Sequence, residues 1–85
     1  MNTKYEFTGE EKEALGRILK RIRAIEDFNN IKAGDIGGWI EKEENLSHKD
    51  SAWVFDNACV YGDARVYGYA QVSGNAQVYG SARLS

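Results

Sequence analysis

The hydrophobic pattern changes halfway along the chain, where a repeat of six residues begins. From Ala52 onward an alanine recurs at every sixth position, and an aliphatic residue follows each alanine by two positions. The aliphatic positions are Val54, Val60, Val66, Val72, Val78 and Leu84. Because the alanine and the aliphatic residue are two apart, both side chains point to the same side of an extended segment. The pattern predicts a series of very short strands with one apolar face.

The residues between these strands are typical of tight turns. Glycine fills the fifth position of most repeats, and Asp56 takes that place in the first one. One repeat is therefore a short strand plus a corner, and three repeats close a triangle of about eighteen residues. This predicts a mainly β fold, a parallel β-helix of two to three coils. The alternative is an antiparallel meander with glycine turns, although meander strands are usually longer.

The triangular winding also predicts a register. Residues eighteen apart should be neighbours on adjacent strands, about 4.8 Å from each other. The expected pairs are Tyr61 with Tyr79, Asn57 with Asn75, Arg65 with Arg83, and Trp53 with Gln71. Aromatic pairs and amide ladders stabilise stacked strands, whereas a pair of arginines carries a small electrostatic cost. The arginine pair therefore predicts a solvent-exposed face.

Residues 1–51 lack the repeat, and we expect them to cap the β-helix formed by residues 52–85. Lys4–Phe7 favours a short strand. A capping-box pattern from Thr8 to Glu11, followed by apolar residues at helical spacing, favours a helix over Glu10–Arg23. Those apolar residues are Leu15, Ile18, Leu19 and Ile22.

Glycines and a tryptophan mark the entry to the repeat. Gly34, Gly37 and Gly38 indicate tight backbone, and Trp39 follows them directly. We expect Trp39 to plug the end of the β-helix, because covering that end hides strand edges and apolar side chains from water.

The segment before the repeat resembles a known group of proteins. The residues that carry the resemblance are Ala24, Asp27, Phe28, Ile31–Gly34, Gly37–Ile40, Asn45–Ser47 and Trp53–Val54. They are similar to the hexapeptide-repeat, YdcK-like left-handed β-helix proteins, which include small phage and prophage proteins, over roughly Leu19–Ser85. The resemblance implies the left hand of the coil and a strand near Ile18–Ile25, with Gly16 at or near a turn. We favour a strand at Leu19–Ile25, with a mostly helical cap as the alternative.

The far end of the repeat favours self-association. The sequence stops at Ser85 in mid-repeat, and repeat arrays normally need a terminal cap. We expect another copy to complete the last coil, in a dimer or a trimer. The residues expected at such contacts are Trp53, Phe55, Tyr61, Tyr67, Tyr69, Tyr79, Val78 and Leu84. An excess of outward aromatic side chains usually marks a contact surface.

Composition narrows the chemistry further. The formal net charge is −2, and the basic cluster of Arg17, Lys20, Arg21 and Arg23 is diluted by acidic residues, so we do not expect nucleic-acid binding. The single Cys59 allows no internal disulfide and fits the cytoplasm, and the N-terminus shows no signal peptide or membrane span. We expect no metal or cofactor. The only histidine, His48, favours a surface residue over a catalytic base.

These observations predict a non-enzymatic, self-associating interaction or structural module of phage or prophage type. One version is an inhibitor of a host factor, such as a defence system. The alternative is an acyltransferase-like hexapeptide-repeat protein or its remnant, because proteins of this fold are often labelled transferases and a shared fold does not establish activity.

Overall fold

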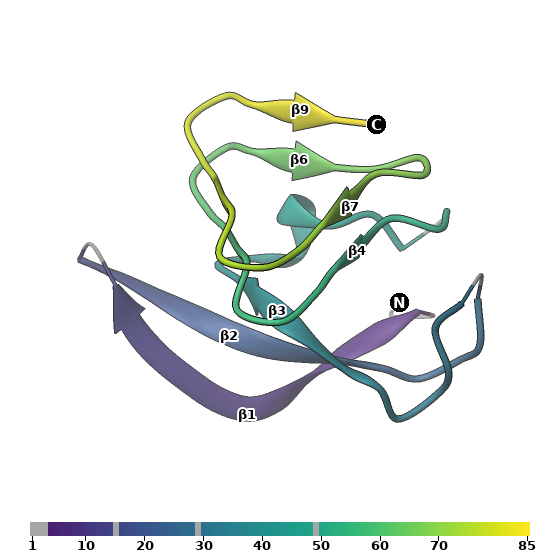
Figure 1. Ribbon diagram of the computed structural model, residues 1–85. Helices are drawn as coiled ribbons and strands as arrows, with labels where there is room; N and C mark the ends of the chain where they lie inside the picture. Colours follow the sequence, from purple (N-terminus) through teal and green to yellow (C-terminus); the bar gives the residue numbers. More distant parts are fainter. Residues whose placement is uncertain (1–3, 15, 29, 49) are drawn as a thin grey trace.

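The computed structural model describes residues 4–14, 16–28, 30–48 and 50–85 (Figure 1). Strands β1 (Tyr5–Ala14), β2 (Arg17–Ala24) and β3 (Ile36–Ile40) precede η1 (Glu43–Asn45), a single 3-10 turn. Six two-residue strands follow: β4 (Trp53–Val54), β5 (Cys59–Val60), β6 (Arg65–Val66), β7 (Gln71–Val72), β8 (Gln77–Val78) and β9 (Arg83–Leu84). The prediction of a mainly β fold is confirmed for the described residues.

Strands β1 and β2 form an antiparallel hairpin, so the helix predicted over Glu10–Arg23 is wrong. The capping-box residues lie inside β1, and Gly16 lies in the turn between the strands with a φ of 74°. Both faces of β2 carry apolar side chains, because Leu19 packs on one side of the sheet and Ile22 on the other. When both faces of a strand carry apolar residues, their spacing in the sequence can match that of one face of a helix. Leu15, part of the same pattern, lies outside the described residues.

The strands of the repeat pair in parallel with the predicted register. Trp53 lies opposite Gln71, and Arg65 lies opposite Arg83. The Tyr61 and Tyr79 rings stack with their centroids 5.4 Å apart. The antiparallel meander is therefore wrong for these strands.

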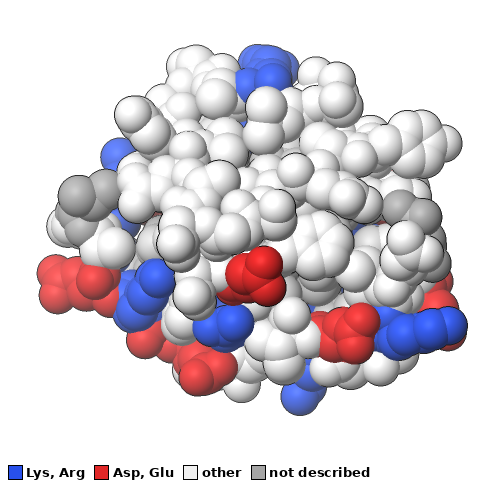
Figure 2. Space-filling view, viewed as in Figure 1, with Lys and Arg blue, Asp and Glu red and all other residues white. Residues whose placement is uncertain are grey.

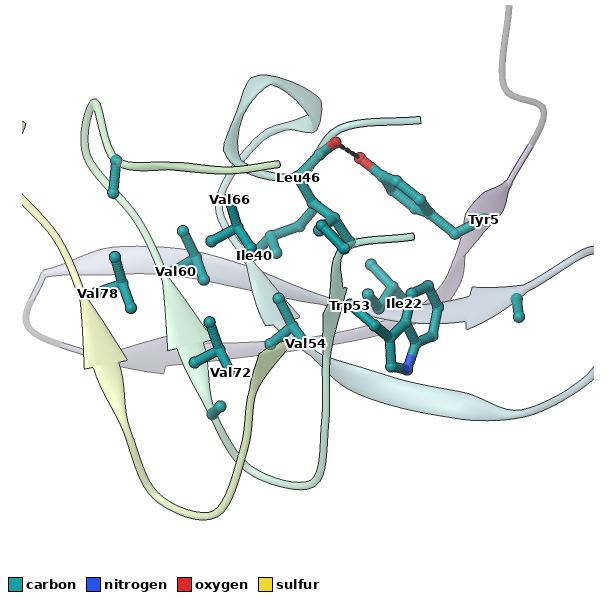
Figure 3. Packing of buried hydrophobic residues seen from close by; sticks show 14 of the residues in the cluster. Tyr5, Ile22, Ile40, Leu46, Trp53, Val54, Val60, Val66, Val72 and Val78 are labelled. Atoms are coloured by element: carbon teal, nitrogen blue, oxygen red, sulfur yellow. Dashed lines mark hydrogen bonds between the residues drawn. The ribbon is translucent and has the colours of Figure 1, made fainter. Parts of the chain in front are cut away.

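Successive strands of the repeat visit three sheets in rotation (Figure 1). The apolar residues pair in three rows: Ile40 with Val60 and Val78, Leu46 with Val66 and Leu84, and Val54 with Val72. All of these except Leu84 belong to one buried cluster (Figure 3). At about 2 kcal/mol for each fully buried valine or leucine, this cluster is the main source of stability.

The two tryptophans lie differently from the prediction. Trp53 was expected to be exposed, but it is 1% exposed and packs edge-on against Phe28 and Tyr5. Trp39 was expected to plug the coil; instead its ring lies in a second cluster, on the other face of the five-stranded sheet. The reason is strand alternation: the side chain of Ile40 points into the main cluster, so that of Trp39 points away from it.

Gly37 and Gly38 let β3 approach the repeat closely. A Cβ atom at Gly38 would lie 2.6 Å from the carbonyl oxygen of Ala58, and one at Gly37 would lie 2.8 Å from that of Val54. Gly34 differs, because it has open space around it and a φ of 96° in the turn before β3. The prediction of tight backbone therefore applies to Gly37 and Gly38 through packing, and to Gly34 through its conformation.

Candidate functional site

A pocket of about 610 Å³ opens where η1 and the segment after it meet strands β6 and β9. Its lining residues are Glu43, Glu44, Leu46, Ser47, His48, Arg65, Val66, Tyr67 and Arg83. A volume of this size is in the range of small-molecule sites in proteins. None of the polar lining residues had been predicted as a ligand group from the sequence.

Asn45 fixes the η1 wall of the pocket. Its side-chain oxygen accepts hydrogen bonds from the backbone N–H groups of Glu41 and Lys42, at 3.1 and 2.9 Å. Its amide nitrogen donates to the carbonyl oxygens of Gly62 and Ala64, at 3.2 and 2.8 Å. Asn45 is fully buried; its two amide donors join η1 to the turn before β6, and its side-chain oxygen holds the backbone that leads into η1.

Tyr5 supports the same wall from the N-terminal strand. Its hydroxyl donates to the carbonyl oxygen of Leu46 at 2.8 Å, and the ring is fully buried (Figure 3). Burial raises the pKa of the Tyr5 phenol, and the charges of Glu43 and Glu44 raise it further. The hydroxyl therefore stays a neutral donor.

His48 is held between this tyrosine and η1. The imidazole stacks on the Tyr5 ring with centroids 3.9 Å apart, and its Nε2 lies 3.1 Å from a carboxylate oxygen of Glu43. The side chain is 19% exposed, so His48 is a partly covered residue with defined contacts. Its Nδ1 is buried, with no hydrogen-bond partner among the described residues.

Two arginines contribute basic groups to the pocket. Arg65 and Arg83 are neighbours on β6 and β9, and both are exposed, as the register predicted. From Ala64 to Ser85 they are the only charged residues in the sequence. No ion pair within 4.0 Å joins either arginine to an acidic group of the described chain. On the face shown in Figure 2, the acidic residues lie in the lower half.

The basic cluster predicted on residues 17–23 is partly neutralised, because two of its four cations form ion pairs. Arg17 pairs with Glu41, Arg23 pairs with Glu6, and Arg21 donates to the carbonyl oxygen of Asp56. The backbone N–H of Gly62 and the nearby Arg17 guanidinium lower the pKa of the Glu41 carboxyl. These cations also lie over aromatic rings, Arg17 over Tyr61 and Arg21 over Trp39. They form a structural layer on the outer face of the sheet.

The predicted contact residues divide into exposed and buried sets. Tyr67, Tyr69, Tyr79 and Leu84 are exposed by 39%, 82%, 58% and 37%. Trp53 and Tyr61 are buried, at 1% and 7%, so the prediction that they are exposed for contacts is wrong. Tyr61 is covered by Arg17 and Tyr79, and Trp53 by the N-terminal strands. Phe55 is half-buried against the main cluster, and Val78 is 9% exposed.

Other chemistry is sparse in the described ranges. Cys59 is buried, and its thiol donates to the carbonyl oxygen of Asn57 at 3.4 Å. Within residues 4–14, 16–28, 30–48 and 50–85, no three histidine, cysteine or acidic side chains gather as they would around a metal ion. The same residues include no helix with the length and apolar character needed to cross a membrane.

Comparison with known proteins adds one relative. The chain is 40% identical over 52 residues to a protein of Escherichia coli (strain K12) described as "Uncharacterized acetyltransferase YdcK". The match covers 61% of this chain and only 15% of that protein, so the chain spans a small part of its relative. No protein-family model matches the sequence. The comparison supports a relation to hexapeptide-repeat proteins.

Proposed function

We propose that this chain is a non-enzymatic, self-associating interaction module, built as a short left-handed parallel β-helix of the hexapeptide-repeat type. The eighteen-residue register and the rotation through three sheets support the winding. The left hand is taken from the resemblance to YdcK-like proteins, and the sequence match to one of them supports that resemblance.

The open edges of three sheets carry this proposal. In the described chain β7, β8 and β9 are each the outermost strand of their sheet. Such edges present backbone donors and acceptors that pair readily with another strand. Leu84 and Tyr79 lie at these edges, 37% and 58% exposed. A second copy has three edges with the same spacing, so two such ends match each other in a twofold dimer.

Sedimentation analysis at micromolar concentration tests this proposal. We expect the wild-type chain to sediment as a dimer, and the double variant Tyr79→Lys, Leu84→Lys to sediment as a monomer because like charges repel at the contact. The variant Ile36→Lys is a matched control, since Ile36 is 50% exposed but lies on β3, away from the open edges. A monomeric wild-type chain would refute the proposal.

The proposal extends to a second protein as partner. A rigid surface with exposed Tyr67 and Tyr69 is typical of protein contacts, where tyrosine is enriched. For a module of phage or prophage type, the partner is a host factor in the cytoplasm, such as part of a defence system. Tagged chain should recover one dominant host protein from lysate, and the variant Tyr67→Ser, Tyr69→Ser should lose it.

An acyltransferase-like activity is the second candidate, because the relative is described as an acetyltransferase and His48 lies in the pocket with a carboxylate at 3.1 Å. A histidine oriented by a carboxylate is a common general base. Two observations argue against a role of His48 as general base. Its Nε2 is engaged by Glu43, and its Nδ1 is buried. Acetyl-CoA should raise the melting temperature of the wild-type chain if a donor site exists, and should raise that of His48→Gln less.

A further inference from the structure

We infer that the pocket between η1 and strands β6 and β9 binds a small phosphate monoester whose remaining part is neutral or cationic. The two guanidinium groups of Arg65 and Arg83 form the phosphate site, and the acidic groups of η1 select the rest of the ligand. The argument for this site does not rest on the self-association proposed above.

Two arginines in register form a strong anion site. Strand pairing places Arg65 beside Arg83, on strands about 4.8 Å apart. Two positive charges at this spacing repel each other, and no acidic group of the described residues pairs with either one. A bound anion removes that repulsion. A guanidinium group presents parallel N–H donors that match the oxygens of a phosphate.

The charge of the pair favours a monoester over a carboxylate or a diester. A phosphate monoester carries a charge of about −1.5 to −2 at neutral pH, which matches two arginines. A carboxylate or a phosphodiester carries a single negative charge and would leave the pair half neutralised. The pocket volume of about 610 Å³ leaves room for an organic group beyond the phosphate.

The acidic wall determines what that organic group can be. Glu43 and Glu44 line the same pocket as the arginines, and Glu43 is already engaged by His48. A second anionic group on the ligand would be repelled by Glu44, as would the neighbouring phosphates of a nucleic acid. A neutral or cationic group is accepted there, and the exposed ring of Tyr67 offers a face to a cation.

Calorimetric titration with three probes tests the inference: O-phosphoethanolamine, ethyl phosphate and 3-phosphoglycerate. We expect affinity to fall in that order, because the remaining part of the ligand changes from cationic to neutral to anionic. Arg65→Gln and Arg83→Gln should each weaken O-phosphoethanolamine binding by about tenfold, a typical loss for one charge-assisted contact. Arg23→Gln is the control and should bind like the wild type, because Arg23 pairs with Glu6 on β1.

Glu44→Gln separates charge selection from simple anion binding. This variant should bind 3-phosphoglycerate more tightly than the wild type and O-phosphoethanolamine less tightly. Both arginine variants should keep the wild-type circular dichroism spectrum, since the side chains are exposed and their removal relieves repulsion.

Three results would overturn the inference. One is that none of the three probes binds. Another is that Arg65→Gln and Arg83→Gln each bind O-phosphoethanolamine as tightly as the wild type does. The third is binding only to vesicles of phosphatidylethanolamine or to single-stranded RNA, which would assign the arginines to a membrane or a polymer instead.

Discussion

At the scale of single residues, the buried polar groups hold the two halves of the chain together. Asn45 and Lys4 are both buried, and each reaches across the boundary between the N-terminal segment and the repeat. The Lys4 ammonium donates to the carbonyl oxygens of Asp50 and Ala52, at 2.8 and 2.7 Å. Such groups stabilise a fold only while all of their partners are in place.

Asn45→Ala should destabilise the protein strongly. The change leaves the carbonyl oxygens of Gly62 and Ala64 without this donor in a buried site, and we expect a loss of about 3 kcal/mol in the free energy of unfolding. Urea denaturation measures the loss. Asn75→Ala is the matched control, because Asn75 is exposed in a turn of the repeat and should change stability by less than about 0.5 kcal/mol. Equal losses in the two variants would show that the bonds of Asn45 contribute little.

Lys4 should make stability depend on pH. Burial lowers the pKa of the Lys4 ammonium from 10.5 to about 8, against the raising effects of Asp50 and Glu26. The unfolded chain therefore binds more protons than the folded one between these values, so stability rises with pH there. Below about pH 8 the full cost of burying the charge is present.

We expect the free energy of unfolding to increase by about 1 kcal/mol from pH 7 to pH 9 in the wild type. Lys4→Met should be less stable at pH 7, because two carbonyl oxygens lose their donor, and it should lack that increase. Urea denaturation at both pH values measures the effect. Lys12→Met, on the other face near Trp39, should keep the wild-type increase. If the stability of Lys4→Met still increases from pH 7 to pH 9, another titratable group is responsible for the pH dependence.

At the scale of elements, β3 connects the hairpin to the repeat, and its glycines make that possible. We expect Gly38→Ala to destabilise the protein by about 3 kcal/mol, since its methyl group would clash with the backbone oxygen of Ala58. Gly74→Ala should cost about 1 kcal/mol, because it has free space and only an unfavourable φ of 68°. Thermal unfolding of the two variants compares the stability lost to a steric clash in Gly38→Ala with the stability lost to backbone strain in Gly74→Ala. A Gly38→Ala variant as stable as Gly74→Ala would mean that β3 can shift.

The repeat could be predicted from the sequence because its information is local and periodic. The positions of Val54 to Leu84 fixed the strands, and the spacing of eighteen fixed the pairs Trp53–Gln71 and Arg65–Arg83. The hairpin was harder to predict, because β2 is covered on both faces. Apolar residues on two faces of a strand have the same sequence spacing as those on one face of a helix.

The pocket could not be predicted, because its walls are far apart in the sequence. Glu43 and His48 lie near each other in the chain, but only the parallel pairing of Leu46 with Val66 brings them to Arg65 and Arg83. The buried state of Trp53 was missed for a related reason. Its strand position points outward, and the side chains that cover it come from Tyr5 and Phe28 in the non-repeating half.

At the scale of the whole molecule, stability should fall from the hairpin end to the open edges. The fully buried core residues lie between the start of β1 and β6, whereas Leu84 on β9 and the turn residues before it are exposed. Local opening is easiest where few apolar contacts must be broken. Amide hydrogen exchange should therefore be slowest in β3 and β5 and fastest in β9.

Self-association would change this gradient in a measurable way. If a second copy covers the outer edges of β7, β8 and β9, exchange of their amides should slow as the protein concentration rises, because a partner bound only to the folded chain stabilises it by mass action. The double variant Tyr79→Lys, Leu84→Lys should show fast exchange in these strands at every concentration, while β3 and β5 keep their protection. Concentration-independent exchange in the wild type would mean that the open edges have no partner in a second copy, and the exposed tyrosines would then have to be explained by another protein.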